Sequence, residues 1–390
     1  MGKRIRLVIF IIFIGSLLLS CQKGKEQYET SYHAKRDGID ILLKEELDIM
    51  QRKRNVTLAA VGDILIHDRV YNDAKGTEGY HFMPMLEKVQ PYLSQPTITT
   101  ANQETMIGGE EIGLSSYPRF NSPVAVGDAL KTVGVDIVSL ANNHTLDRGE
   151  QAIQRAISHW NNINMPYVGS YHSQEDSEKV RVIHTEEDIS LSFLGYTYGT
   201  NGIPTPDGKE YLVNRINRKA IAKDVKKAKK VSDVVVLNLH FGNQYERMPN
   251  EKQKDLVQYV ADLGVDVVFG HHPHVLQPME WIEGEKGNRT FVIYSLGNFL
   301  SGQDEFYRRI GGMVQLTIQK EWDKGKERIT LHSPKFLPTF VDFTEESESD
   351  YQVIPMYQLT DEQLTDHEKH YKEMQQHLSQ WMPELTFIEK

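Results

Sequence analysis

The stretch GHHPH places His271, His272 and His274 directly after an apolar run at 265–269. Such a run is typical of a buried strand, and a packed core rarely places imidazoles at the end of one. Neutral imidazole is, by contrast, a common metal ligand. In an extended segment, side chains two positions apart project to the same side, and Pro273 disfavours the helical conformation for the residue before it. We therefore predict that His272 and His274 are metal ligands, and that His271 points away, toward a supporting or surface position.

Polar side chains also end four other apolar runs. They are Asp63, Asn102 with Glu104, Asn143 with His144, and His240. In addition, residues 134–138 and 264–268 have nearly the same sequence, GVDIV and GVDVV, and both lead into Asn or His side chains. Because ligands of open α/β sheets bind beyond the carboxyl ends of the strands, we expect all these side chains to line one crevice.

The types of these side chains indicate the chemistry. Carboxylate oxygens, amide oxygens and imidazoles are ligands for Mn, Fe or Zn, and no thiolate is needed. A carboxylate can also bridge two ions about 3.5–4 Å apart, an arrangement suited to the hydrolysis of phosphate esters. The sequence therefore predicts a site for one or two divalent metal ions (Mn, Fe or Zn).

The remaining pattern indicates the elements that position this site. Near-continuous apolar runs, typical of strands covered on both faces, recur at 56–61, 97–101, 135–140, 234–239 and 265–269. Segments with helical periodicity lie between several of them, at 124–133, 150–161, 218–231 and 251–263. Stretches richer in strands follow at 181–198 and 280–340. The alternation of strands and helices predicts an α/β fold.

The N-terminus predicts export. Basic residues at positions 3, 4 and 6 precede an apolar run at 7–19, and the sequence LLSC then ends at Cys21, the one cysteine of the chain. This order is that of a signal peptide, and the run is shorter than the roughly 20 residues of a spanning helix. LLSC resembles the lipobox of bacterial lipoproteins, which implies lipidation of Cys21 and a place on the outer face of the cytoplasmic membrane. The alternative is an uncleaved membrane anchor. With no cysteine pair, no disulfide is expected.

Four segments follow from these patterns. Residues 1–20 form the predicted lipoprotein signal peptide, and residues 21–54 form a polar tether. Residues 55–340 contain the α/β domain with the candidate site. Residues 341–390 are an acidic and then helical extension, with the helix expected at 361–380.

Charge limits the range of partners. The formal net charge of −10 argues against a broad positive surface, so nucleic acid is not an expected partner. No run of Lys and Arg interleaved with aromatic residues occurs in the sequence. Arg119 and Arg308 are candidates for contacting an anionic substrate, although a single arginine is more often part of a solvated face.

Six short motifs resemble those of one protein family in order and spacing. They are VGDILIH, NQE, LANNHTLDRG, LHFGNQYE, GHHPHVLQ and IYSLGNF. These motifs resemble the CapA family of poly-γ-glutamate capsule biosynthesis proteins over residues 55–340. The resemblance implies a four-layer α/β/β/α sandwich of the metallophosphoesterase type with a two-metal centre.

The resemblance also implies a role for each candidate ligand. Glu104 would bridge two metal ions. The first ion would also be bound by Asp63 and His274. The further ligands of the second ion would be Asn143, His240 and His272.

Other residues would act around the ions. By the same resemblance, His144 paired with Asp147 would be the general acid that protonates the leaving oxygen, a task that suits an imidazole held by a carboxylate. Asn102 would support Glu104 and line the substrate site. Asn298, in the SLGNF stretch, would line the same pocket.

The sequence departs from the family pattern at two positions. Metallophosphoesterases usually have Asp-x-His on the first strand, but residue 65 here is Leu. The first metal site is therefore short of a ligand, which leaves open a single ion or a weakly held second one, with His67 a speculative substitute. Gln244 stands where the family tends to have glutamate, which puts proton transfer there in doubt. Whether Glu246 compensates is left open.

Two classes of function fit these observations. In the first, a membrane-anchored protein of the CapA type takes part in the synthesis, export or anchoring of poly-γ-glutamate, with synthase or export subunits as partners. In the second, the protein is a metal-dependent hydrolase of a phosphoester or a polymer amide, unrelated to a capsule. An acidic net charge opposes the binding of polyglutamate unless metal ions or local basic groups offset the repulsion. A solute-binding lipoprotein is a weaker alternative, because its pocket would not need so many metal-type ligands.

Overall fold

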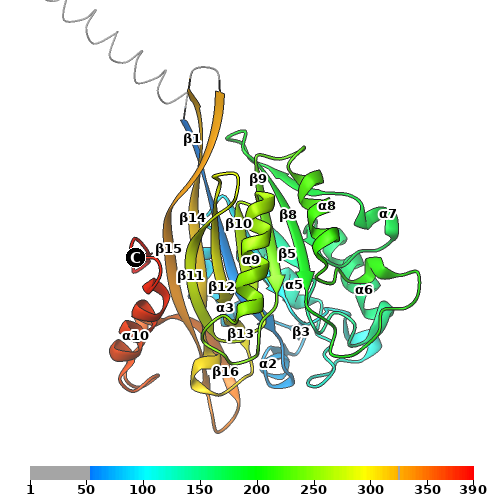
Figure 1. The fold of residues 1–390 in the computed structure, drawn as a ribbon. Coiled ribbons are helices and arrows are strands. Elements are labelled where there is room, and N and C mark those ends of the chain that lie inside the picture. The colour runs from blue at the N-terminus through cyan, green and yellow to red at the C-terminus, as the bar shows by residue number, and fades with distance from the viewer. Residues whose placement is uncertain (1–52, 324–325) are drawn as a thin grey trace, which may run out of the picture. The chain divides into compact units, whose positions relative to one another are not determined.

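The computed structural model describes residues 53–323 and 326–390 (Figure 1). The predicted signal peptide, the predicted lipidation site and nearly all of the tether lie outside these residues. Contacts divide the chain into two units, and the smaller includes Glu321–Glu327. The larger unit comprises Asn55–Lys320 with Arg328–Lys390 and contains the whole candidate site. No helix in the described part of the chain is both long and apolar enough to span a membrane.

The first of two large sheets has nine strands within the described residues. Their order is β16-β15-β14-β1-β4-β5-β6, with β13 also paired to β1 and β17 to β15. The strands are β1 Lys53–Leu65, β4 Ile98–Gln103, β5 Ile137–Ser139, β6 Tyr167–Val168, β13 Asn298–Ser301, β14 Ile310–Asp323, β15 Lys326–Thr344, β16 Ser349–Pro355 and β17 Thr386–Phe387. Strands β1, β4, β5 and β6 are parallel, so their carboxyl ends lie at one edge.

The second sheet has six strands in the order β11-β12-β10-β9-β8-β7. They are β7 Arg181–His184, β8 Ser190–Thr197, β9 Val234–His240, β10 Val267–His271, β11 Leu276–Glu283 and β12 Arg289–Leu296. The four inner strands are parallel, whereas β7 and β11 pair antiparallel at the two edges. A separate short pair consists of β2 Lys75–Gly76 and β3 Gly79–Tyr80.

Helices cover the outer faces of both sheets (Figure 1). The α-helices of the described residues are α2 Asp68–Asp73, α3 Met83–Leu86, α4 Gln90–Leu93, α5 Ala125–Thr132, α6 Gly149–Asn162, α7 Gln174–Ser177, α8 Arg218–Ala228, α9 Glu251–Leu263 and α10 His367–Ser379. Short 3-10 helices are η1 Glu110–Ile112, η2 Glu210–Leu212, η3 Phe306–Arg309 and η4 Met356–Gln358.

Three buried cores define the layers. Between the sheets, Leu58 of the first sheet lies in one apolar cluster with Phe269 of the second. On the outer face of the first sheet, strand residues pack with helical side chains such as Trp160 of α6. On the outer face of the second, Val225 of α8 and Val257 of α9 pack with the strands. Helix, sheet, sheet and helix follow one another, so the predicted four-layer α/β/β/α sandwich is confirmed.

Local signals explain where elements begin and end. Helix α9 begins with a capping box, in which the Asn250 side chain accepts a hydrogen bond from Gln253 N and the Gln253 side chain accepts one from Asn250 N, each at 3.0 Å. It ends at Gly264, whose φ of 87° is left-handed and easily adopted by glycine. The helix therefore stops immediately before the apolar run that becomes β10.

The repeated GVD sequences have the same structural role in the two sheets. Thr99 N donates a hydrogen bond to Asp136 Oδ2, and Val235 N donates one to Asp266 Oδ2, both at 2.8 Å. In return, the backbone N–H of each aspartate donates to the carbonyl oxygen of the same partner. Each aspartate thus aligns the start of a strand, β5 or β10, with the strand beside it.

The segment after residue 340 belongs to the sandwich. The predicted boundary at 340 falls inside β15, and β16 then pairs antiparallel with β15. Helix α10, which is the helix expected at 361–380, lies against β11. Its apolar side chains Met374 and Leu378 are buried in the core between the sheets. Residues 341–390 therefore complete that core, because the apolar face of α10 would otherwise be exposed.

Candidate metal centre

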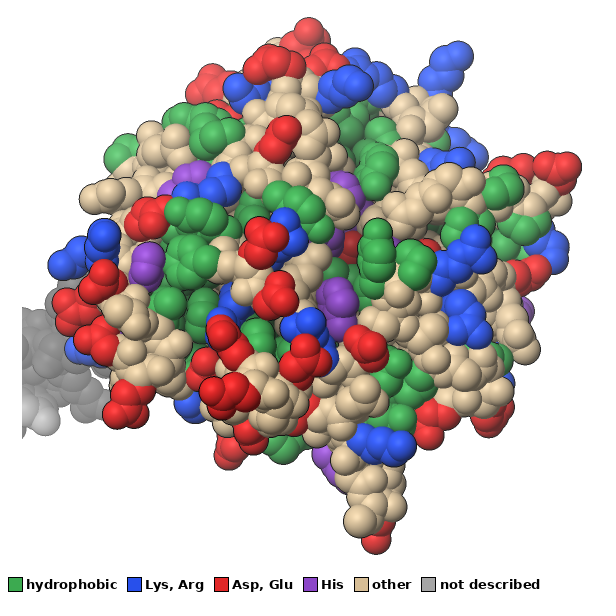
Figure 2. Space-filling model, turned by 90° about the horizontal axis from the view of Figure 1, so that it is seen from below, with side chains coloured by type: hydrophobic (Ala, Val, Ile, Leu, Met, Phe, Trp, Pro, Cys, Tyr) green, Lys and Arg blue, Asp and Glu red, His purple; other side chains and the backbone are tan. Residues whose placement is uncertain are grey.

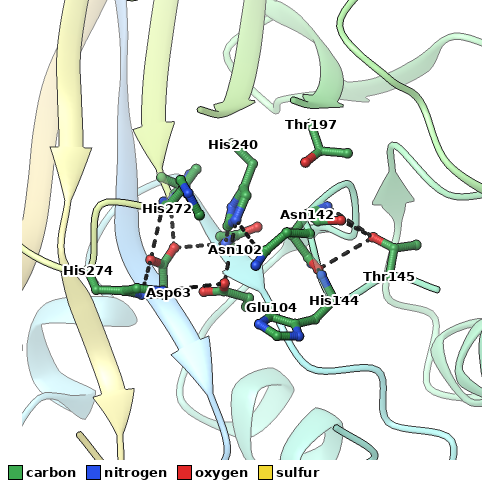
Figure 3. Close-up of polar contacts among 12 residues, drawn as sticks. Asp63, Asn102, Glu104, Asn142, His144, Thr145, Thr197, His240, His272 and His274 are labelled. Carbon is green, nitrogen blue, oxygen red and sulfur yellow. Dashed lines mark hydrogen bonds and ion pairs between the residues drawn. The ribbon is translucent and has the colours of Figure 1, made fainter. Parts of the chain in front are cut away.

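Side chains at the carboxyl ends of strands from both sheets meet at one buried site (Figure 3). Asp63 belongs to β1 and Glu104 follows β4 of the first sheet. His240 ends β9 of the second sheet, and His272 and His274 follow β10. All five are at most 3% exposed. The structure therefore brings together the strand-end residues that the sequence singled out.

The ligand atoms of these residues form two overlapping groups. In Glu104, His240 and His272 the atoms lie within 4.8 Å of one another, and the same holds for Asp63, Glu104 and His274. His240 Nε2 lies 3.4 Å from Glu104 Oε1, and His274 Nδ1 lies 3.3 Å from Asp63 Oδ2. Glu104 is common to both groups, which is the position a bridging carboxylate requires.

The unpaired atoms of the site fit a cation. Within the described residues, neither carboxylate oxygen of Glu104 has a hydrogen-bond partner, nor do His272 Nδ1 and Asn102 Oδ1, although all are buried. A buried polar atom without a hydrogen-bond partner is unfavourable, and more so when it is charged. A divalent cation would satisfy these atoms, and carboxylate, amide oxygen and imidazole are suitable ligands for such an ion. The residues present therefore fit a divalent metal.

The two carboxylates of the site differ in pKa. Burial raises the pKa of Glu104 to about 8, and the negative charge of Asp63 adds to this rise. Burial would also raise the pKa of Asp63, but the close imidazoles of His271 and His274 hold it well below its usual range. The negative charge of the metal-free site is therefore concentrated on Asp63.

The imidazoles also differ. Burial lowers the pKa of His272 to about 2 and that of His240 well below its usual range. Both rings are therefore neutral at physiological pH, which is the state in which an imidazole nitrogen binds metal. Burial acts in the same direction on His274, but Glu104 and Asp63 raise its pKa to about 9.

The His-Pro-His segment is not extended, so the geometric part of the prediction was wrong. His272 and His274 have φ values of 99° and 59°, a left-handed conformation that is uncommon for residues other than glycine. Their ring centroids nevertheless lie 5.8 Å apart, on the same side of the chain. The backbone N–H of His272 lies 3.4 Å from Asp63 Oδ2. Strained backbone of this kind is concentrated at functional sites.

His271 faces the site instead of pointing away. It is paired in register with His240 in the parallel β9–β10 ladder and is 1% exposed. Its Nδ1 atom lies 3.3 Å from Asp63 Oδ1. The sequence argument missed this orientation because it assumed that strand alternation continues through His272, whereas the chain turns there.

His144 and Asp147 form the predicted pair. His144 Nδ1 lies 2.6 Å from Asp147 Oδ2, and the same oxygen accepts a hydrogen bond from Phe120 N at 2.8 Å. The Phe120 ring packs edge-on against the imidazole, with centroids 4.7 Å apart. The carboxylate therefore fixes the orientation of the imidazole, and the role of the pair as general acid stays a prediction.

Asn102 and Asn143 contact the same imidazole. Asn102 Nδ2 donates a hydrogen bond to Asp63 Oδ1 at 2.8 Å and lies 3.3 Å from His240 Nδ1. Asn143 Oδ1 lies 2.7 Å from His240 Nε2, next to the group formed by Glu104, His240 and His272. Asn102 therefore supports Asp63 and His240, whereas the sequence predicted that it supports Glu104. Its contact with substrate stays a prediction.

Asn298 is fully buried and connects the site to a loop. Its Oδ1 atom lies 3.0 Å from His274 Nδ1. Its Nδ2 atom donates to Gln303 Oε1 at 3.0 Å and to the carbonyl oxygen of Arg308 at 2.8 Å. All its polar atoms are therefore engaged within the protein, and contact with a substrate stays a prediction.

Among the described residues, the group of Asp63, Glu104 and His274 gains no substitute for the missing histidine. Leu65 is buried and apolar. His67 Nδ1 lies 3.0 Å from Leu65 O and 3.1 Å from Gly302 N, and His67 belongs to neither ligand group. Gln244 and Glu246 are both exposed.

Two tyrosines that the sequence argument did not single out lie at the opening of the site. Tyr198 is 48% exposed, and its ring centroid lies 4.6 Å from that of His272. Tyr245 is 41% exposed, with its centroid 6.0 Å from that of His274. The face of the molecule drawn in Figure 2 shows hydrophobic side chains, histidines and side chains of both charges close together. Tyr198 directly follows β8, so the strand-end criterion could have found it.

The fold and site define a class: an α/β/β/α sandwich with a candidate two-metal centre at the carboxyl ends of its strands. Residues 57–303 match the family model described as bacterial capsule synthesis protein PGA_cap. This match covers more than half of the 390 residues, and the chain belongs to that family.

Two curated relatives are similar to part of the chain. One is the PGA biosynthesis protein CapA of Bacillus subtilis (strain 168), 30% identical over 198 residues, which cover 49% of this chain and 49% of the relative. The other is the capsule biosynthesis protein CapA of Bacillus anthracis, 27% identical over 286 residues, which cover 69% of this chain and 65% of the relative. The chain thus spans less than two thirds of the length of either relative.

Similar solved structures include two phosphoesterase-type proteins. The calcineurin-like phosphoesterase YfkN of Bacillus subtilis has a TM-score of 0.41 at 13% identity, covering 83% of this chain and 99% of that one. A putative 5'-nucleotidase of Staphylococcus aureus, solved with alpha-ketoglutarate, has the same TM-score and identity and covers 82% and 58%.

Proposed function

We propose that the protein takes part in the synthesis, export or anchoring of a poly-γ-glutamate capsule, and that a divalent metal site of the metallophosphoesterase type is essential to this role. The observation that carries the metal site is Glu104, a buried carboxylate without a hydrogen-bond partner that is common to two ligand groups. Family membership and the names of the two Bacillus relatives support the proposed role in a capsule.

Particular residues would hold the ions. Glu104 with Asp63 and His274 would hold one ion, and Glu104 with Asn143, His240 and His272 the other. When bound, the ions would polarise an oxygen of the substrate and offset negative charge near it. The supporting contacts to Asp63 and His274 would keep these ligands in place without a shift on binding.

His144 is the side chain best placed to move a proton. Its Nδ1 atom is occupied by Asp147 at 2.6 Å. Nε2 is therefore the nitrogen that would give a proton to a bound group or take one from it. The edge of the Phe120 ring restricts rotation of the imidazole and excludes water from one side.

The metal site is tested by elemental analysis of the full chain, purified in detergent and loaded with Mn or Zn. We expect about two equivalents of metal, with one equivalent if the group that lacks the histidine at position 65 is weak. A His272→Ala/His274→Ala variant should lose both. His184→Ala, an exposed histidine of β7, is the matched control and should bind as the parent does. If the parent binds no metal after loading, the proposal of a metal site is wrong.

A second candidate function is hydrolysis of a phosphoester or polymer amide without a role in a capsule. The His144–Asp147 pair favours this alternative, because a general acid beside a metal cluster is used to cleave bonds. Metal-loaded protein is assayed with a chromogenic phosphodiester and with poly-γ-glutamate. Turnover of the ester alone, lowered about 10²–10⁴-fold by His144→Ala, would support the alternative over the capsule role.

We also propose that lipidated Cys21 holds the protein on the outer face of the cytoplasmic membrane, where the polymer emerges and synthase or export subunits would be partners. Support comes from the basic, apolar and LLSC segments of the N-terminus. Cys21→Ser should release the protein from the membrane fraction. Unchanged membrane attachment of this variant would instead favour the uncleaved anchor.

A further inference from the structure

We propose that Arg308, stacked on Tyr245, binds a carboxylate of an acidic polymer next to the metal centre. This inference rests on the proposed function, and it adds a binding subsite to it: a position for a second carboxylate of the chain, beyond the group held at the metals. The sequence offered both Arg119 and Arg308 as candidates, and the contacts of Arg308 with Tyr245 and Asn298 support Arg308.

The first observation is the position of the guanidinium. Its carbon lies 3.5 Å from the centre of the Tyr245 ring, a close cation–π stack. The Tyr245 ring centroid lies 6.0 Å from that of His274. One phenol ring therefore separates the cation of Arg308 from an imidazole of the metal centre. Stacking fixes the plane of the guanidinium, and the edge that bears the N–H donors can meet a carboxylate in that plane.

The second observation is that the buried side chain of Asn298 contacts both His274 and the backbone of Arg308. Asn298 Oδ1 lies 3.0 Å from His274 Nδ1, while Asn298 Nδ2 donates to the carbonyl oxygen of Arg308 at 2.8 Å. Asn298 is 0% exposed. The backbone of Arg308 is therefore linked through Asn298 to a candidate metal ligand, which is not expected for an arginine whose role is only to be solvated.

The third observation is the strained backbone of Tyr245. Its φ of 67° is left-handed, which is unusual for a bulky residue. Its backbone N–H donates to Pro273 O, within the His-Pro-His segment, at 2.8 Å. The loop thus keeps an unfavourable conformation that holds an exposed ring between Arg308 and the metal centre. Strain maintained at a site opening is typical of a binding function.

The ion-pair partner of Arg308 is exposed and can be displaced by a substrate carboxylate. Arg308 Nη2 lies 3.1 Å from Glu305 Oε1, and the Glu305 side chain is 68% exposed. An ion pair with so exposed a partner is weak, so a carboxylate of the substrate can replace it. The neighbouring Asp304 is paired with Arg69 at 3.6 Å. Arg308 therefore supplies the local positive charge that a protein of net charge −10 needs to accept an acidic polymer.

The test measures binding of γ-linked glutamate oligomers to the full, Mn-loaded chain by calorimetry. Arg308→Gln should weaken binding of the pentamer about tenfold, while Mn stoichiometry and binding of free glutamate stay unchanged. Glu305→Gln should strengthen pentamer binding, because it removes the competing carboxylate. The control is Arg289→Gln, since Arg289 also stacks on an aromatic ring, that of Trp281 at 4.3 Å, and pairs with a glutamate. It should leave binding unchanged.

The outcomes separate the subsite from the proposed function. If Arg308→Gln and Glu305→Gln both weaken binding, the pair only braces the loop and the inference fails. It also fails if Arg308→Gln leaves pentamer binding intact, although the proposed function then stands. If Arg308→Gln affects tripolyphosphate but not the pentamer, the bound group is a phosphate and the carboxylate assignment is overturned. If the metal-loaded parent binds no γ-glutamate oligomer, the proposed function itself falls.

Discussion

His240 Nε2 and Asn143 Oδ1 lie 2.7 Å apart, and this contact joins the two sheets at the candidate site. Asn143 follows β5 of the first sheet, whereas His240 ends β9 of the second. Because the oxygen can only accept, Nε2 carries the proton in the metal-free protein. An ion bound at Nε2 would replace that proton, so the atoms that join the sheets in the metal-free state are those that would hold the ion.

Substitution of Glu104 by Gln should stabilise the metal-free protein. Because burial raises the pKa of Glu104 to about 8, this group costs stability as pH rises from about 4 to 8, and at pH 8 the change should raise the free energy of unfolding by about 1–3 kcal/mol. The same variant should lose the stabilisation by metal, which for the parent is about 2.7 kcal/mol at a metal concentration of 100 Kd. Denaturant unfolding with chelator and with Mn measures both effects. Glu110→Gln, an exposed site in η1, is the control, and a less stable metal-free E104Q protein would contradict the prediction.

His271→Ala should weaken the binding of only one of the two metal ions. The imidazole lies 3.3 Å from Asp63 Oδ1 and supports that carboxylate, and loss of such a support typically lowers metal affinity 10–100-fold. Stepwise titration with Mn should therefore show one step shifted and the other unchanged. His67→Ala tests the substitute considered from sequence and should shift neither step, because His67 lies outside both ligand groups. Equal effects of the two variants would argue against a specific support by His271.

Glu373→Gln should loosen two loops near the site. Glu373 Oε1 lies 2.7 Å from Arg247 Nη1 and accepts a hydrogen bond from Tyr307 Oη at 2.9 Å, so it joins α10 to two separate loops. Loss of the charge should lower the free energy of unfolding by about 1 kcal/mol and speed amide hydrogen exchange at 241–249 and 302–309. Glu368→Gln, exposed on the same helix, is the control. Unaltered exchange in both loops would refute this coupling.

Asp266 should make stability depend on pH. Burial raises the pKa of Asp266 to about 6, above its value in an unfolded chain, so the folded state favours the protonated form. Its contribution is therefore most favourable below about pH 4 and is lost as pH rises through 6. Asp266→Asn keeps an oxygen for Val235 N without the charge, and should be more stable than the parent by about 3 kcal/mol at pH 8, with little gain at pH 4. Thermal unfolding across this range measures the difference. A gain that does not change with pH would contradict the assigned pKa.

The strands and most of the strand-end residues that meet at the candidate site could be predicted from local patterns, whereas the four layers were implied by the family resemblance. Near-continuous apolar runs mark strands buried on both faces, and the polar residue at the end of each run is visible in the sequence itself. Asp63, Glu104 and His240 could therefore be assigned to one edge without a structure. The type of each side chain, carboxylate or imidazole, also limited the chemistry to that of a divalent ion.

Tertiary structure alone decided how these side chains face one another. The left-handed turn at His272 brings His271 onto Asp63, and no local pattern indicated it, since a bulky residue with positive φ is stable only when distant contacts hold it. The stack of Arg308 on Tyr245 joins residues on different loops in the same way. Such contacts depend on where the two sheets meet, so only the packed sandwich determines them.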